Sequence, residues 1–171
     1  MKPFTQGNLD GMCGIYSVVN ALHSIRPLRD KRAEWLFKII IKKFPSIFPR
    51  AFYEGTSFEE LHLINNFVAK KLFTKRYKCY LPIRKKKVIE EWVDILEKRL
   101  SSGTAAVIVG LGDPEHHWTV CVGVERKRNG RYLRLFDSNW GIKTFRESKF
   151  STSKKRDKIQ VNTTETIVIG K

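Results

Sequence analysis

The stretch HWTVCVGVERKRNGRYLRLFDSN, residues 117–139, holds two runs rich in β-branched and aromatic residues joined by a turn signal. Asn129-Gly130 is a dipeptide typical of two-residue hairpin turns, in which both central residues take positive φ. We therefore expect antiparallel strands over 117–127 and 132–139. Antiparallel pairing places the start of the first strand beside the end of the second, so His117 and the sequence FDSN should lie close together.

Other strands are expected on both sides of this hairpin. The segment TAAVIVGLG, residues 104–112, is a continuous apolar run bounded by glycine, which is typical of a strand buried on both faces. Shorter strands are predicted at RYKCYLPI (76–83), IKTFRE (142–147) and ETIVIGK (165–171), with a polar loop over 151–158.

The first hundred residues favour helices instead. Ser57 and Glu60 form a capping box, in which each side chain satisfies an orphan backbone N–H at the helix start. Apolar spacing predicts helices over 13–25, 31–44, 57–72 and 86–100, and prolines and a glycine predict a loop over 45–55. Helices followed by antiparallel strands indicate an α+β fold, and no boundary or repeat divides residues 1–171, so we expect a single domain.

The charge of the chain is strongly positive and uneven. There are 33 Lys and Arg against 17 Asp and Glu, and no acidic residue lies between Leu61 and Ile89. A second basic region runs from Arg126 to Lys158. Such surfaces attract nucleic acid or an acidic protein partner, and nearby aromatics such as Tyr77 could stack on bases. A non-catalytic nucleic-acid-binding module is therefore one hypothesis, although no helix-turn-helix, RNP or zinc pattern accompanies the charge.

The cysteine content favours a reducing compartment. The three cysteines, Cys13, Cys79 and Cys121, are widely spaced and form no CxxC pair, so we expect thiols rather than disulfides. The N-terminal sequence MKPFTQG lacks the apolar core of a signal peptide, and no apolar run is long enough for a membrane span. A cytoplasmic location is expected, with an exported effector lacking a signal peptide as the alternative.

Cys13 stands in QGNLDGMCGIYSVVNALHS, residues 6–24, at the predicted start of a helix. The positive end of the helix dipole favours thiolate over thiol at this position. Gly11 and Gly14 leave space around the sulfur for a substrate carbonyl. A single thiol is more often a small buried hydrophobic side chain than a nucleophile, so the interpretation depends on the residues that could accompany it.

Residues suited to accompany a nucleophile occur elsewhere in the chain. His117, or its neighbour His116, could act as the general base at the start of a strand. Asp137, or alternatively Asn139, could orient the imidazole from the paired strand. Gln6 could donate its amide to a developing oxyanion together with the backbone N–H of Cys13. The pair of histidines has no obvious third ligand for a metal, and neither a metal nor a cofactor is expected.

These segments resemble the papain-like cysteine peptidase superfamily, and the C39-like peptidases in particular. The resemblance covers Gln6 with DGMCGIYSVVNAL, and HHWTVCVGV followed by LFDSN. DGMC is also similar to the Asp-Gly-x-Cys motif of OTU-type deubiquitinating proteases. The resemblance implies a papain-like fold with N-terminal helices on a C-terminal antiparallel sheet. It also implies Cys13 as nucleophile, His117 as base, Asp137 as orienter and Gln6 as oxyanion donor.

The expected function is a cysteine peptidase or amide hydrolase, a thiol-protease-like enzyme acting on a protein or peptide. A glutamine deamidase or acyltransferase acting on a partner protein is the alternative that keeps the same triad, because one acyl-enzyme can pass to different acceptors. The sequence leaves the substrate undetermined, and residues 25–103 match no known pattern.

Overall fold

The computed structural model describes residues 1–6, 11–72, 78–80, 88–112 and 116–170. Its α-helices lie in the first hundred residues, as the apolar spacing predicts. They are α1 (Cys13–Ile25), α2 (Asp30–Lys43), α3 (Arg50–Glu54), α4 (Phe58–Leu72) and α5 (Ile89–Leu100). The capping box at the start of α4 is confirmed: Ser57 N–H donates to the Glu60 carboxylate at 2.9 Å, and Glu60 N–H donates to the Ser57 hydroxyl at 3.2 Å.

The strands form one curled sheet. In chain order they are β1 (Lys78–Tyr80), β2 (Ala105–Leu111), β3 (His117–Lys127), β4 (Gly130–Asp137), β5 (Gly141–Arg146), β6 (Phe150–Ser151) and β7 (Ile159–Gly170). Their order across the sheet is β1-β7-β2-β3-β4-β5, with antiparallel pairing throughout, and β6 pairs in parallel with β7. The α+β class is therefore confirmed.

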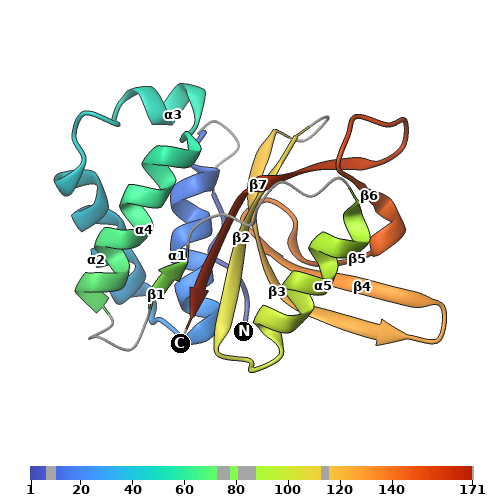
Figure 1. The fold of residues 1–171 in the computed structure, drawn as a ribbon. Helices are drawn as coiled ribbons and strands as arrows, with labels where there is room; N and C mark the ends of the chain where they lie inside the picture. Colours follow the sequence, from blue (N-terminus) through green and yellow to red (C-terminus); the bar gives the residue numbers. More distant parts are fainter. Residues whose placement is uncertain (7–10, 73–77, 81–87, 113–115, 171) are drawn as a thin grey trace.

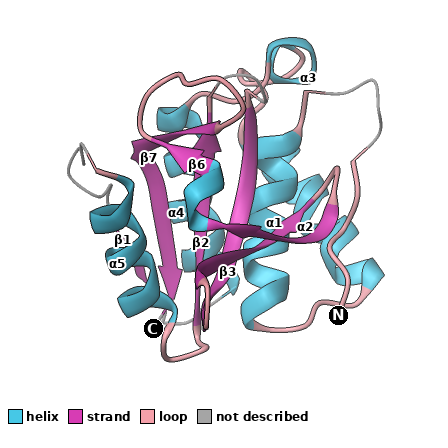
Figure 2. Ribbon diagram, turned by 90° about the vertical axis from the view of Figure 1, so that its right-hand side faces the viewer, coloured by secondary structure: helices cyan, strands magenta, loops and turns pink. Residues whose placement is uncertain are grey.

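Both faces of the sheet are covered by helices (Figure 1). On one face, Ala106 and Ile108 of β2 pack in a core shared with α1, α2 and α4; on the other, Val107 and Val109 join a second core with α5. Successive strand residues point to opposite faces. Burial on both faces therefore explains why β2 reads as a continuous apolar run. In the turned view, α5 lies on the opposite side of the sheet from α1 and α2 (Figure 2).

The predicted hairpin of β3 and β4 is present. Its pairs run from Lys127 with Gly130 at the turn to Val120 with Phe136, and the register shifts once between Cys121 and Gly123. The two residues of the turn are Arg128 and Asn129 rather than the expected Asn129 and Gly130, and Asn129 does not take a positive φ. Gly130, the first residue of β4, has a φ of 129°, which a residue with a side chain rarely adopts. The hairpin brings the start of β3 and the end of β4 to the same edge of the sheet, as expected.

Two segments differ from the sequence-based expectation. Within the predicted loop 45–55, α3 begins immediately after Pro49 and buries Ala51 completely; proline here starts a helix because its missing N–H would be unpaired in the first turn anyway. Strand β7 begins at Ile159 rather than at 165, since Ile159 and Val161 are buried and alternate with half-buried neighbours. Of the predicted strand 76–83, only Lys78–Tyr80 lies within the described residues.

Candidate active site

Cys13 is the first residue of α1, and the turn before it depends on glycine. Gly11 N–H donates to the Phe52 carbonyl at 2.6 Å, and a Cβ at Gly11 would lie 3.0 to 3.2 Å from backbone atoms of residues 51, 52 and 55. No larger residue fits without moving α3. The first N–H groups of a helix have no intrahelical acceptor, so the backbone N–H of Cys13 has the geometry to donate to a bound oxyanion. The Cys13 side chain is 9% exposed.

His117 is the first residue of β3, and its ring lies between Cys13 and Asp137. Its Nε2 is 2.9 Å from Oδ2 of Asp137, and the side chain of Cys13 lies close enough to raise the pKa of the ring, while the Cys13 thiol faces the Gly11 carbonyl at 3.9 Å. Because Nε2 faces the carboxylate, Nδ1 is the nitrogen available to the sulfur. The Trp140 ring lies 5.7 Å from the imidazole, centroid to centroid. This indole is a neighbour that the sequence did not single out.

Asp137, the last residue of β4, is completely buried. Its Oδ1 accepts the backbone N–H groups of Asn139 at 2.7 Å and Trp140 at 2.9 Å. These bonds are those of an Asx turn, in which the side chain of Asp organises the backbone that follows it. The carboxylate is thereby fixed from behind while Oδ2 faces His117.

The alternative residues His116 and Asn139 do not lie where His117 and Asp137 lie. Asn139 is exposed and contributes its backbone N–H to Asp137. His116 is exposed, has a φ of 42° and precedes the strand, and its backbone N–H bonds to the carbonyl of Gly112. The structure therefore brings together Cys13, His117 and Asp137, the set that the sequence favours.

The electrostatics of this set favour a charged pair. Burial of the His117 ring opposes its protonation, but the hydrogen bonds and charges of Asp137 and Cys13 outweigh burial and raise the pKa of His117 to about 9. Burial also acts to raise the pKa of Asp137, yet that pKa is lowered overall, because His117 and the Trp140 N–H stabilise the carboxylate. The raised pKa of His117 and the lowered pKa of Asp137 both favour an imidazolium beside a carboxylate at neutral pH.

Gln6 is held at the Asp137 end of the site. Its Oε1 accepts a hydrogen bond from the Ser138 hydroxyl at 2.9 Å, and its backbone N–H donates to the Ser138 carbonyl at 3.3 Å. An amide whose oxygen is engaged by a donor presents its nitrogen on the other side. Ser138 was not predicted as a site residue; its only sequence signal is its place directly after Asp137.

Polar residues of α1 dock the helix against its surroundings. The Ser17 hydroxyl donates to the Trp118 carbonyl at 2.9 Å, and Trp118 Nε1 donates to the Thr56 carbonyl at 2.9 Å. Asn20 bonds both to the N–H of Phe4 and to its carbonyl, at 2.7 and 2.9 Å. The helix is thereby fixed to β3, and the segment leading to Gln6 is fixed to the helix. Ser17 and Asn20 could have been noticed as polar residues on an otherwise apolar helix.

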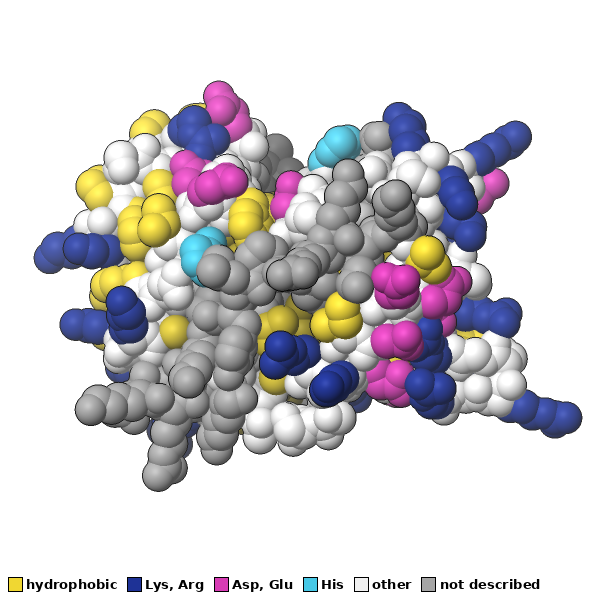
Figure 3. Space-filling view, in the orientation of Figure 1, with side chains coloured by type: hydrophobic (Ala, Val, Ile, Leu, Met, Phe, Trp, Pro, Cys, Tyr) yellow, Lys and Arg dark blue, Asp and Glu magenta, His cyan; other side chains and the backbone are white. Residues whose placement is uncertain are grey.

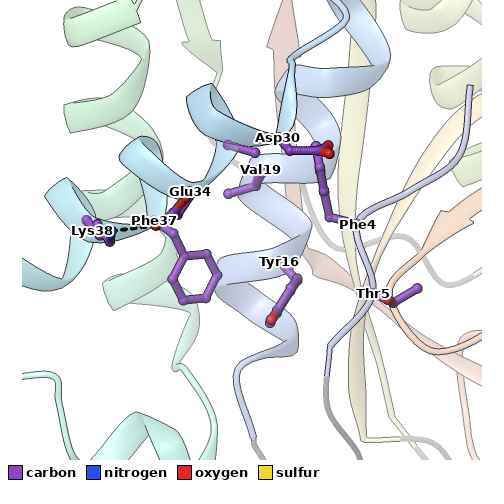
Figure 4. Close-up of a pocket in the computed structure, with 9 residues that line it drawn as sticks. Phe4, Thr5, Tyr16, Val19, Asp30, Glu34, Phe37 and Lys38 are labelled. Atoms are coloured by element: carbon purple, nitrogen blue, oxygen red, sulfur yellow. Dashed lines mark hydrogen bonds and ion pairs between the residues drawn. The ribbon is translucent and has the colours of Figure 1, made fainter.

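A cavity of about 450 Å³ lies beside α1 (Figure 4). It opens between the N-terminal segment and α2, and its walls include Phe4, Tyr16 and Phe37, with Asp30 and Glu34 among the polar lining residues. Tyr16 is one helical turn after Cys13, but Cys13, His117 and Asp137 do not line this space. It is therefore a neighbouring cavity rather than the centre of the candidate site.

The basic regions of the chain are only partly neutralised. Arg131 pairs with Asp94 and Glu147, and Arg126 pairs with Glu97 at 2.6 Å. Acidic side chains accordingly gather beside Lys and Arg on the right of Figure 3. Most of the basic run 70–87 lies outside the described residues, so its expected role as a docking surface stays a prediction.

Among the described residues, no three His, Cys, Asp or Glu side chains come together in a group that could hold a metal ion. No helix within the described ranges has both the length and the apolar character needed to cross a membrane. Comparison with protein-family models and with curated protein sequences finds no match to this chain.

Proposed function

We propose that this chain is a cysteine hydrolase with a papain-like architecture, cleaving an amide or isopeptide bond in a protein or peptide. One observation carries the proposal: the His117 ring lies beside the Cys13 side chain, which helps to raise its pKa, and its Nε2 lies 2.9 Å from the buried carboxylate of Asp137. A nucleophile, a base and an orienter in contact are the arrangement that activates a weak nucleophile.

The proposed reaction begins from an ion pair, in which Cys13 is a thiolate and His117 is an imidazolium that carries a proton on Nδ1. The thiolate then adds to the substrate carbonyl carbon, and the carbonyl oxygen becomes an oxyanion that accepts from the Cys13 N–H and from the Gln6 amide. When the C–N bond breaks, His117 gives its proton to the departing amine and an acyl-enzyme remains. His117 then takes a proton from water, whose oxygen attacks the acyl carbon; the C–S bond breaks, which releases the acid and restores the Cys13 thiolate beside protonated His117.

The helix and sheet positions suit these roles. The nucleophile lies at a helix start, where partial positive charge favours an anion. The base and orienter lie on paired strands, whose register fixes their separation. Asp137 remains ionised throughout and stabilises the imidazolium, as the orienting member of a triad does.

Alkylation by iodoacetamide at neutral pH, followed by peptide mapping, tests the proposal without a known substrate. Cys13 should react fastest, and His117→Ala should slow it. Cys121 is an internal control, because complete burial raises the pKa of its thiol to about 12 and leaves little nucleophilic thiolate. Equal rates at Cys13 and Cys121 in the folded protein, or no effect of His117→Ala, would contradict the proposal.

Mass spectrometry of candidate partner proteins then identifies the acceptor. Two fragments of a partner would indicate hydrolysis of its backbone. An intact partner with a small increase in mass would indicate deamidation of a glutamine, and attachment of an amine would indicate transfer from the same acyl-enzyme.

A further inference from the structure

Thr119 lies on β3 two residues after His117, so the two side chains point to the same face of the sheet. The register of the hairpin pairs Val120 with Phe136. Continued by one residue, it sets Thr119 directly opposite Asp137. Residues opposed in an antiparallel pair have Cβ atoms about 5 Å apart, which is within the reach of a hydroxyl and a carboxylate.

The surroundings of Thr119 offer its hydroxyl few other partners. The side chain is completely buried, and its neighbours Val109, across the ladder on β2, and Cys121, next along the same face, both belong to the apolar core under α5. The hydroxyl oxygen has no hydrogen-bond partner among the residues that the structure describes. A buried hydroxyl without a hydrogen-bond partner is unfavourable, so an acceptor near the Thr119 hydroxyl is expected.

The Asp137 carboxylate can accept one more hydrogen bond. An ionised carboxylate has about four acceptor sites. Oδ1 accepts from the N–H groups of Asn139 and Trp140, and Oδ2 faces Nε2 of His117. One site on Oδ2 is therefore left on a carboxylate that is itself completely buried.

We propose that Thr119 is a positioning residue whose hydroxyl donates to Asp137 and holds the carboxylate in plane with the imidazole of His117. The effect on Cys13 chemistry rests on the function proposed above, whereas the effect on Asp137 does not. The direction of the Asp137 pKa is consistent with such a donor, since Thr119 acts to lower it.

Two variants separate a hydroxyl role from a packing role. Thr119→Val keeps the shape and both branches of the side chain but removes the donor; Thr119→Ser keeps the donor but removes the methyl group. The Asp137 carboxyl is titrated by carbon-13 NMR in each protein, and Cys13 alkylation by iodoacetamide is followed against pH. Thr119→Val should raise the titration midpoint of Asp137 by roughly one pH unit and slow alkylation several-fold, and Thr119→Ser should restore both.

A titration midpoint of Asp137 that is unchanged in Thr119→Val and shifted in Thr119→Ser would show that Thr119 only packs. That result would overturn the inference. An unchanged midpoint in both variants would overturn it as well. Thr119→Ala provides the same comparison if the valine variant does not fold, because it too lacks the hydroxyl. A raised Asp137 midpoint together with an unreactive Cys13 in the wild-type protein would support the role of Thr119 and count against the proposed hydrolase.

Discussion

His117 and Asp137, 20 residues apart in the chain, lie 2.9 Å apart from Nε2 to Oδ2, with 7% and 0% of their side chains exposed. The hairpin between them creates this contact, because it returns the chain to the edge of the sheet from which it started. Since both groups are buried, the charge on one controls the charge on the other. The reactivity of Cys13 should therefore depend on a residue that does not touch the sulfur.

Asp137→Asn is expected to preserve the fold around the Asx turn and remove the charge that favours the imidazolium. Loss of a nearby opposite charge should lower the pKa of His117 by roughly one to two units. Alkylation of Cys13 at neutral pH should then fall on the order of tenfold. NMR titration of the His117 ring and peptide mapping measure the two effects. Asp157→Asn, at an exposed loop residue, is the matched control, and equal effects of both substitutions would refute the prediction.

The raised pKa of His117 also predicts a dependence of stability on pH. A histidine whose pKa rises from 6.5 to about 9 on folding contributes stability that is complete below about pH 6.5 and is lost as pH rises through about 9. The wild-type protein should lose on the order of 2 to 3 kcal/mol more than His117→Gln between pH 6 and pH 10. Urea unfolding at the two pH values measures this difference. Parallel stability curves for the two proteins would exclude a charged His117 in the native state.

The sequence predicted the parts of the site that local patterns control. Asn129-Gly130 indicated the hairpin, although the turn itself is one residue earlier, and the hairpin places His117 beside Asp137. The apolar spacing from Ile15 onwards set the start of α1, and so placed Cys13 at its first turn. These features depend on neighbours in the chain or on one short connection, which is why they could be predicted.

The features of the site that the sequence did not predict depend on contacts between distant segments of the chain. Ser138 bonds to Gln6 across 132 positions, and Ser17 bonds to the Trp118 carbonyl across 101. The choice between Asp137 and Asn139 is also made in three dimensions: the strand ends at Asp137 with its side chain inward, and two residues later the chain has turned outward. Residue type alone, carboxylate or amide, does not encode that direction.

Gln6 should matter for turnover and not for alkylation. Alkylation by iodoacetamide forms no oxyanion, so Gln6→Ala should leave the labelling rate of Cys13 within about a factor of two, whereas loss of an oxyanion donor typically lowers kcat by about 100- to 1000-fold. Hydrolysis of any substrate found by partner screening supplies the second measurement. Ser138→Ala is the control, since it removes the hydroxyl that donates to Gln6 Oε1 and keeps the Gln6 amide itself. If Gln6→Ala slowed alkylation as much as hydrolysis, Gln6 would act by supporting Asp137 rather than by binding the oxyanion.

Gly14 tests how closely the helix start is packed against the rest of the site. A Cβ at this position would lie 2.9 Å from Thr56 Oγ1, 3.0 Å from Thr56 Cβ and 3.3 Å from Trp118 Cδ1. Alanine favours a helix over glycine by about 1 kcal/mol, but overpacking a buried contact costs typically about 1 to 3 kcal/mol. Gly14→Ala should therefore lower the free energy of unfolding despite its better helix propensity.

A second substitution, Thr56→Ala, should reduce the overpacking that Gly14→Ala causes. Thr56→Ala removes the nearest atom, Oγ1, which is buried and has no hydrogen-bond partner among the described residues. Gly14→Ala should therefore cost less stability in the Thr56→Ala variant than in the wild-type protein. The expected coupling energy in a double-mutant cycle is about 0.5 kcal/mol or more. Urea unfolding of the four proteins provides the measurement. Additive changes would mean that the Gly14 contact with Thr56 relaxes freely, and that the turn carrying Cys13 is not fixed by close packing.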